Sequence, residues 1–321
     1  MRLLGLGIFL LFTTHAQAGA LTFYGQIQAN YGDVRAKTDG HTTQRQALGS
    51  TGSLVGIKGF TPLNHKLDIT FMNETRLHLQ THKNNLRSLS NQKQHWVGLR
   101  SPYGELRTGK QLMPNQVLTY ELDRFQDQFG SAETLIQPNT TVTDSLLYIQ
   151  RLGKAEIALG YGRDKDTTLS ERSVRGGLIN YKAKQNWVLG AGVEVKPNTY
   201  VDGRLSINFK TDKAQLGALY QHLDTQSTQV QGQDVNALLL NASRTQGNWT
   251  LKAQLGRKKD KTASATKLSA LGLEYAVNPK TQLYAEYSVV KDKDGTAQLG
   301  AESQLKGQRV QATSVGMVYK F

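Results

Sequence analysis

Charged residues at alternate positions of several segments are the part of this sequence best suited to chemistry. Lys58, Glu74 and Arg76 are opposite in parity to neighbouring apolar residues, so a strand would turn them to one face. Charges of both signs around a narrow, water-filled passage set a field that selects among ions, and low-dielectric walls focus that field. Some pairs could instead be ordinary salt bridges that fix one segment to another. The candidate residues are Lys58, Lys66, Glu74, Arg76, Arg107, Lys110, Glu121, Asp123 and Asp127.

Covalent catalysis is the alternative chemistry, and the sequence argues against it. A hydrolase needs a nucleophile with a positioned base, but no Gly-x-Ser-x-Gly element is present. Glu74, His78 and His82 are spaced like metal ligands on a helix, yet we expect strand and loop there. We therefore predict no enzyme activity, no metal and no cofactor. Beyond residue 18 the histidines are His41, His65, His78, His82, His95 and His222, mostly in predicted loops or near turns.

The elements that must position these charges are strands. In the first segment Leu21, Phe23, Ile27 and Tyr31 alternate with polar residues, before a polar stretch that runs to Ser50. Similar segments of about ten residues continue to the end of the chain. Seven short turns join them into eight hairpins, which predicts 16 antiparallel strands. Hydrophobic residues make up only 38% of the chain, as expected if half of each strand faces water. The predicted turns lie at 61–64, 101–104, 152–154, 184–186, 211–213, 245–248 and 278–280.

The two ends of the chain suggest an exported barrel. Residues 1–18 combine a basic start, an apolar run and an Ala-Gln-Ala site, which predicts a signal peptide followed by a barrel over residues 19–321. The last strand places Val315, Met317, Tyr319 and Phe321 on one apolar face. Such a face suits lipid, with the last strand closing against the first. The chain has no cysteine, which excludes disulfides and thiolate metal sites.

The charge distribution bears on possible partners. The formal net charge is +14, but lysine and arginine are scattered and interleaved with acids. A nucleic-acid-binding protein would gather them into a patch or stripe, so we expect no nucleic acid. A solvated interior, or a rim beside anionic lipid, fits this distribution better.

One connection departs from the alternation. Residues 112–139 contain Tyr120, Leu122, Phe125 and Phe129, whose spacing suggests a short helical turn packed on another element. Loops of this length are usually functional or disordered. Because a barrel of about 16 strands leaves an open aqueous channel, we expect this segment to fold inward and narrow it.

A colinear set of motifs runs through the chain. It comprises Leu-Thr-Phe-Tyr-Gly-Gln-Ile at 21–27, Leu-Val-Gly-Ile-Lys-Gly at 54–59, Tyr-Gly-Glu-Leu-Arg-Thr-Gly-Lys-Gln at 103–111, the hairpin at 271–287 and the terminal Phe321. In this order the motifs resemble those of the Gram-negative general porins of the neisserial and beta-proteobacterial type.

The resemblance implies an all-β fold, a 16-stranded transmembrane barrel with an inward-folded third loop. It implies a homotrimer in the outer membrane that passes ions and small hydrophilic solutes by diffusion. It also implies the barrel-assembly machinery as a partner, which reads the terminal Phe321. Outer-membrane lipid is expected from the apolar strand faces, and lipopolysaccharide from basic loop residues such as 257–261, although ordinary solvated loop charge would explain these as well. A substrate-specific porin, or an adhesin or surface antigen on a barrel scaffold, are the alternatives.

The sequence departs from the arginine-rich wall of the anion-selective members. Leu54, Gln94 or His95, and Thr141 stand where arginines are common in the family, and Asp144 stands where asparagine is common. The net positive charge favours anions while the predicted loop is acidic. We therefore expect only a weak anion preference.

Overall fold

The computed structural model describes residues 19–49, 52–77, 92–138, 140–163, 173–225, 234–261, 263–300 and 305–321. The predicted signal peptide, residues 1–18, lies outside the described residues, as do His78 and His82. Within the described part of the chain, no helix is both long and apolar enough to span a bilayer.

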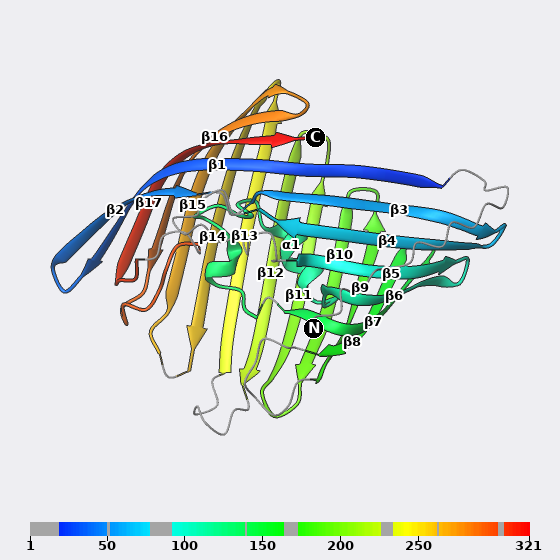
Figure 1. Ribbon diagram of the computed structural model, residues 1–321. Helices are drawn as coiled ribbons and strands as arrows, with labels where there is room; N and C mark the ends of the chain where they lie inside the picture. Colours follow the sequence, from blue (N-terminus) through cyan, green and yellow to red (C-terminus); the bar gives the residue numbers. More distant parts are fainter. Residues whose placement is uncertain are drawn as a thin grey trace, which may run out of the picture.

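Antiparallel strands account for nearly all the regular structure in the described ranges (Figure 1). A short helix, α1 (Gln116–Leu122), and a 3-10 turn, η2 (Ala132–Thr134), lie between β6 and β7. The strands are β1 (Ala20–Thr38), β2 (His41–Gly49), β3 (Leu54–Asn64), β4 (Leu67–Arg76), β5 (Gln92–Ser101), β6 (Gly104–Leu112), β7 (Thr141–Leu152), β8 (Ala155–Arg163), β9 (Ser173–Lys184), β10 (Trp187–Lys196), β11 (Tyr200–Lys210), β12 (Ala214–Thr225), β13 (Asp234–Gln246), β14 (Trp249–Asp260), β15 (Thr266–Asn278), β16 (Thr281–Lys291) and β17 (Arg309–Lys320).

The sheet closes into a barrel because β1 pairs with β17, from Gln26 opposite Lys320 to Lys37 opposite Arg309. Figure 1 shows the two strands side by side, β1 in dark blue and β17 in red. On its other edge, β1 pairs with β3 over Ala20–Gln26 and with β2 over Asn30–Thr38. β2 and β3 are therefore two halves of one barrel strand, and the predicted count of 16 strands is confirmed.

The seven connections at which short turns were predicted lie at one end of the barrel, which we call the turn end. The opposite end, the loop end, carries the longer connections and also the short turns at 39–40 and 197–199. Six predicted turns agree with the structure within a residue or two. At the seventh, β3 continues through Asn64 and the chain turns at His65 and Lys66, where the amide of Lys66 donates to Asn64 Oδ1 at 2.9 Å.

The polar stretch predicted after Tyr31 is instead a regular hairpin. β1 continues to Thr38, and the chain reverses at Asp39 and Gly40, whose φ angles are 47° and 86°. Two successive positive φ values define the type I′ turn that asparagine-glycine and aspartate-glycine pairs favour. The Asp-Gly signal was present in the sequence, but the polar composition around it concealed the strands.

Alternation gives the sheet two faces. Every strand carries exposed apolar side chains on the outer face, from Leu21 and Phe23 in β1 to Val315 and Met317 in β17. The inner face is polar, except where residues 113–138 pack against it and form the main buried cluster. An apolar outside and a polar inside are typical of a transmembrane barrel.

Candidate functional site

Charged side chains line the inner face of β3, β4, β5 and β6. The register places Lys58, Met72 and Trp96 in one row and Asp68, Arg100 and Glu105 in another. All these residues are on the face opposite the exposed Ile57, Ile69 and Leu99. We call the charged inner residues of these four strands the open wall: Lys58, Asp68, Glu74, Arg76, Lys93, Arg100, Glu105 and Arg107.

Glu74 is the centre of one cluster on the open wall. Its carboxylate accepts a hydrogen bond from the Tyr24 hydroxyl at 2.9 Å and lies 3.7 Å from Lys93 Nζ. Lys58 Nζ lies 5.0 Å from the centre of the Tyr24 ring, a cation–π contact. Lys58 itself is exposed and makes no ion pair within the described residues.

Arg107 is the centre of a second cluster. Its guanidinium lies 2.9 Å from Glu105 and 4.1 Å above the centre of the Trp96 ring. The Thr70 hydroxyl also donates to Glu105, at 2.7 Å. Stacking on Trp96 fixes the plane of the guanidinium while its edge stays available to solvent.

Two contacts connect the open wall with the segment between β6 and β7. Arg76 Nη2 lies 3.4 Å from Asp127 Oδ1, and Lys93 Nζ lies 6.0 Å from the centre of the Tyr120 ring. Gln28 on β1 also donates to the backbone carbonyl of Asp127 at 2.9 Å. The acidic segment and the basic wall therefore meet, as opposed charges across a passage would.

In every ion pair of the open wall, the basic side chain is more exposed than its acidic partner. Arg107 retains 24% of its side-chain exposure against 15% for Glu105. The same order holds for Arg76 with Asp127, Lys93 with Glu74, and Arg100 with Asp68. Water next to this wall therefore contacts more cationic than anionic surface.

The other candidate residues lie elsewhere. Lys66 is exposed in the β3–β4 turn. Lys110 is opposite His95, on the outer-face parity of Leu106. Glu121 is exposed on α1, and Asp123 is buried. The structure thus places Lys58, Glu74, Arg76 and Arg107 on one wall, with Asp127 next to Arg76, and with Arg107 in a separate cluster. It does not bring Lys66, Lys110, Glu121 or Asp123 to this wall.

Asp123 stabilises the segment between β6 and β7 through hydrogen bonds inside that segment. Its carboxylate accepts bonds from the amide of Phe125 at 3.0 Å, the amide of Ala132 at 2.9 Å and the Ser131 hydroxyl at 2.8 Å. Gln254 on β14 donates a further bond at 3.1 Å. Burial raises the pKa of Asp123, although these bonds oppose the shift.

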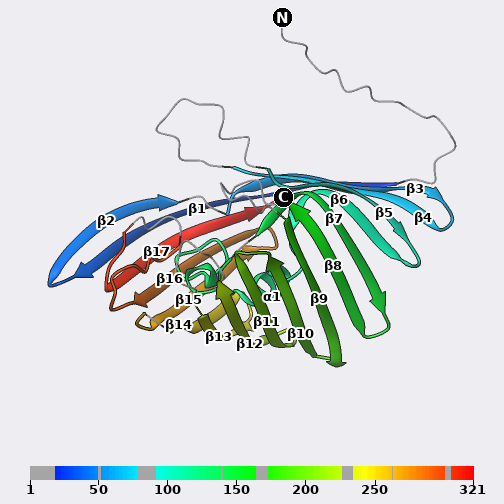
Figure 2. The same ribbon diagram turned by 90° about the horizontal axis from the view of Figure 1, so that it is seen from below.

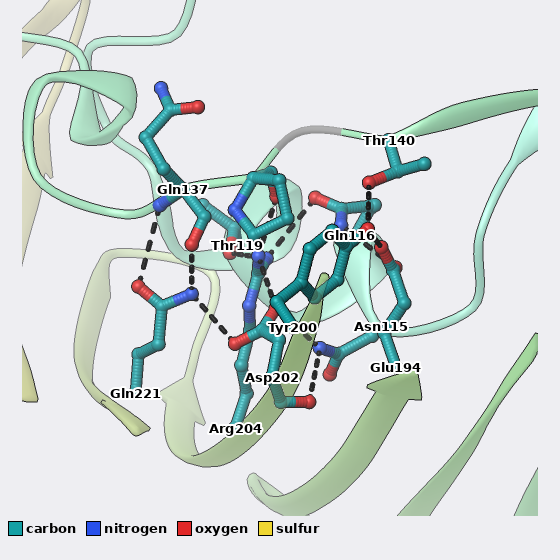
Figure 3. Close-up of polar contacts among 11 residues, drawn as sticks. Asn115, Gln116, Thr119, Gln137, Thr140, Glu194, Tyr200, Asp202, Arg204 and Gln221 are labelled. Carbon is teal, nitrogen blue, oxygen red and sulfur yellow. Dashed lines mark hydrogen bonds and ion pairs between the residues drawn. The ribbon is translucent and has the colours of Figure 1, made fainter. Parts of the chain in front are cut away.

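The opposite side of the barrel holds the same segment through a buried polar network (Figure 3). Arg204 pairs with Asp202 at 2.8 Å and donates to the Thr119 hydroxyl and the Pro138 carbonyl, both at 2.7 Å. Asn115 also donates to Asp202, at 2.9 Å. Neither side chain of the Arg204–Asp202 pair has any exposure to solvent.

Side chains on other strands of this side of the barrel also hold the segment between β6 and β7. Gln116 on α1 donates to Glu194 at 3.0 Å, and Tyr200 donates to the same carboxylate at 2.6 Å. Further along, the amide of Phe129 donates to Glu286 at 2.9 Å, and Lys252 Nζ donates to the Arg124 carbonyl at 3.0 Å. We call the inner side chains of β10–β17 that contact residues 113–138 the covered wall.

Apolar packing fills the space between these polar contacts. Leu118, Leu122, Phe129 and Leu135 from the segment are fully or almost fully buried. Their cluster includes wall residues such as Leu219, Leu239, Leu268 and Val290, all on the inner face. α1 contacts β10, β11 and β12, and in both overall views it lies beside these strands (Figures 1 and 2).

Sequence reasoning missed the residues that hold this segment. Glu194, Asp202, Arg204 and Glu286 occupy strand positions whose parity assigns them to the inner face. The parity was available, but no local pattern indicates which part of a wall a distant segment contacts. Lys93 was missed because a register shift between Glu74 and Thr75 alters the alternation there.

A closed barrel with an apolar exterior and a charged interior defines a channel-forming protein of the outer membrane. Comparison with known families agrees with this class: residues 7–295 match the Gram-negative porins, and the chain belongs to that family. No significant match was found among curated proteins.

Solved porin-like structures share the fold at low sequence identity. The anion-selective porin from Comamonas acidovorans has a TM-score of 0.76 at 18% identity, over 95% of this chain and 100% of that one. OmpT, an outer-membrane protein of Vibrio cholerae, has a TM-score of 0.70 at 16% identity, over 96% of this chain and 99% of that one. Salmonella typhi OmpF in complex with daunomycin has a TM-score of 0.72 at 13% identity, over 94% and 97%.

Proposed function

We propose that this porin passes small hydrophilic solutes and ions by diffusion, with a weak preference for anions. The observation that carries the proposal is the open wall, where each ion pair turns its cation to the water. The segment 113–138, folded inward and attached to the covered wall, narrows the channel beside it. The likeness to an anion-selective porin supports the same preference.

The constriction has the residues needed for selectivity without covalent chemistry. Along the open wall Lys93 pairs with Glu74 and Arg107 with Glu105, and Arg76 pairs with Asp127 of the segment that faces the wall. Fixed charges at short range select ions through their field. We propose that the protein is a channel and not an enzyme, and that it needs no cofactor.

Export by residues 1–18 and assembly in the outer membrane complete the proposal. Phe321 pairs with Gly25 through two backbone hydrogen bonds of 3.1 Å, and its ring lies 5.7 Å from that of Phe23. This aromatic end at the closing seam suits recognition by the barrel-assembly machinery. We further propose a homotrimer, which cross-linking in detergent tests directly: only monomer bands would contradict it.

The outer face offers a contact for lipopolysaccharide phosphates. Five exposed cations occupy one register row across five adjacent strands at the loop end, and none makes an ion pair within the described residues. Apolar residues such as Leu255 follow on the membrane side. The row is Arg257, Lys267, Lys291, Arg309 and Lys37.

Planar-bilayer recording tests the channel and its selectivity. We expect stepwise conductance from purified protein, and a reversal potential in asymmetric KCl whose sign shows a chloride preference. Lys58→Gln combined with Arg107→Gln should lower the chloride-to-potassium permeability ratio. Lys280→Gln, in an exposed turn between β15 and β16, is the matched control.

Each other outcome has a definite meaning. No conductance would sink the channel proposal, and an unchanged ratio in the double variant would remove these two residues from the constriction. Saturation by one solute would favour a substrate-specific porin. Release of fatty acid or cleaved peptide, abolished by replacing one histidine, would favour an enzyme.

A further inference from the structure

A second charged hollow lies away from the open wall, at the turn end of the barrel. It occupies about 560 Å³ between α1 and the inner face of β7–β12. Volumes of this size suit small-molecule ligands. Basic side chains come to it from three separate places: Lys154 from the β7–β8 turn, Lys182 and Lys210 from the wall, and Arg124 from the segment that follows α1.

The positive charge of this hollow is incompletely neutralised. Lys154, Lys182 and Lys210 form no ion pair within the described residues. Arg124 is fixed by neutral oxygens, those of the Glu121 and Leu122 carbonyls and of the Gln215 side chain. Its guanidinium is thus held in one orientation without a carboxylate bound to it, which leaves its charge available to a ligand.

Two carboxylates border the hollow, and they offset this charge only in part. Glu156 pairs with Arg151 at 2.7 Å and is occupied by it. Glu121 is only partly desolvated, and this partial burial together with Glu156 raises its pKa. Five basic and two acidic side chains line the space, which leaves a formal charge of +3 before any ligand enters.

We propose that this hollow binds small solutes carrying phosphate groups, as a second anion site on the turn side of the constriction. Lysine ammonium groups are point charges suited to phosphate, and the fixed planar Arg124 can donate two parallel hydrogen bonds to its oxygens. The inference rests on the proposed channel function, because the ligand reaches the site through the pore. It adds a preference for multiply charged oxyanions, which the exposed cations of the open wall do not by themselves imply.

Pyrophosphate titration of single-channel KCl current tests this site. Wild-type channels should show a concentration-dependent reduction of current that depends on the side of addition. Lys182→Gln combined with Lys210→Gln should raise the half-blocking concentration about tenfold, which corresponds to about 1.4 kcal/mol. Lys280→Gln, which changes the same charge outside the hollow, should leave it unchanged.

Calorimetric titration of detergent-solubilised protein with pyrophosphate measures the same site without conduction. Heat of binding in the wild type, weakened in the double variant, supports the assignment. Conducting channels whose block is the same in wild type and double variant would overturn the site while leaving the channel function intact. Equal block by succinate and pyrophosphate would overturn the preference for phosphate. Folded protein without any conductance would instead contradict the channel function.

Discussion

The open wall and the covered wall share one alternation but differ in what they meet. Each carries an arginine–aspartate pair separated by 2.8 Å: Arg100 with Asp68, and Arg204 with Asp202. The first pair keeps 44% and 26% of its side-chain exposure, and the second keeps none. Identical residue types at an identical distance therefore sit in water on one side and in a dry interface on the other.

This difference teaches that the inner parity of a strand does not by itself make a residue pore-lining. On the covered wall, inner positions hold Leu219, Leu239 and Val290 besides the buried charges, because protein rather than water covers them. On the open wall, inner charges remain partly hydrated, as their proposed action on ions requires. In the proposed channel, the covered wall holds residues 113–138 in place and the open wall supplies the electric field.

The largest effect is expected from Arg204→Met. Removing the guanidinium leaves the Asp202 carboxylate buried, with only Asn115 and Gln221 to bond it. Loss of one partner from a buried pair costs about 3–5 kcal/mol. We expect the free energy of unfolding in detergent, measured with denaturant, to fall by this amount, and the channel conductance to become noisier as residues 113–138 loosen.

A double variant checks the physical reason for that loss. Arg204→Met combined with Asp202→Asn removes the uncompensated charge, so it should recover part of the stability. If Arg204→Met alone lowers the free energy of unfolding by less than about 1 kcal/mol, water must reach the Asp202 carboxylate in this interface.

A smaller effect is expected from Gly256→Ala on the covered wall. An added methyl would overlap Cδ1 of Leu135, a residue of segment 113–138 whose side chain is fully buried against the covered wall. Overpacking of this kind costs about 1–3 kcal/mol. Gly203→Ala is the matched control, because the nearest atom to its added methyl is the His222 carbonyl oxygen at 3.9 Å. Equal unfolding free energies for the two variants would contradict tight packing at Leu135.

The barrel itself could be predicted from the sequence because its signals are local. Alternation and turn residues each operate over a few positions, so the strand count of 16 and six of the turns followed from neighbouring residues. The Asp39-Gly40 hairpin was missed because its flanking residues are mostly polar: between Gly32 and Gln46 the only apolar side chains are Val34 and Ala36, both buried on the inner face.

The positions of the candidate site residues could be predicted only in part, because they depend on long-range contacts. Lys58, Glu74, Arg76 and Arg107 follow from strand parity, but the burial of Asp123 does not. Its partners include Gln254, 131 positions away along the chain. No spacing rule connects residues so far apart, and only the packing of the loop against β14 brings them together.

A modest pH effect is expected at the boundary between the two walls. Burial, with a contribution from Glu156, raises the pKa of Glu121, while Lys210 and Arg124 oppose the shift. As the pH falls, Glu121 is therefore neutralised above the usual glutamate range and the channel becomes more positive. The chloride-to-potassium permeability ratio should rise on acidification, and less so in Glu121→Gln. A permeability ratio that falls on acidification would contradict the proposed role of Glu121 neutralisation.

The smallest effect is expected from Arg100→Met, the counterpart of Arg204→Met on the open wall. Its loss leaves Asp68 partly hydrated rather than buried, and exposed ion pairs contribute only about 0–1 kcal/mol. The guanidinium also lies 4.9 Å from the centre of the Phe60 ring, a contact worth about 0.5–1 kcal/mol at an exposed site, and the methionine retains some of that apolar contact. The unfolding free energy should therefore change by about 1 kcal/mol or less, under the conditions used for Arg204→Met. A loss as large as that of Arg204→Met would mean that the open wall is as dry as the covered one, and its charges would then have no water through which to act on passing ions.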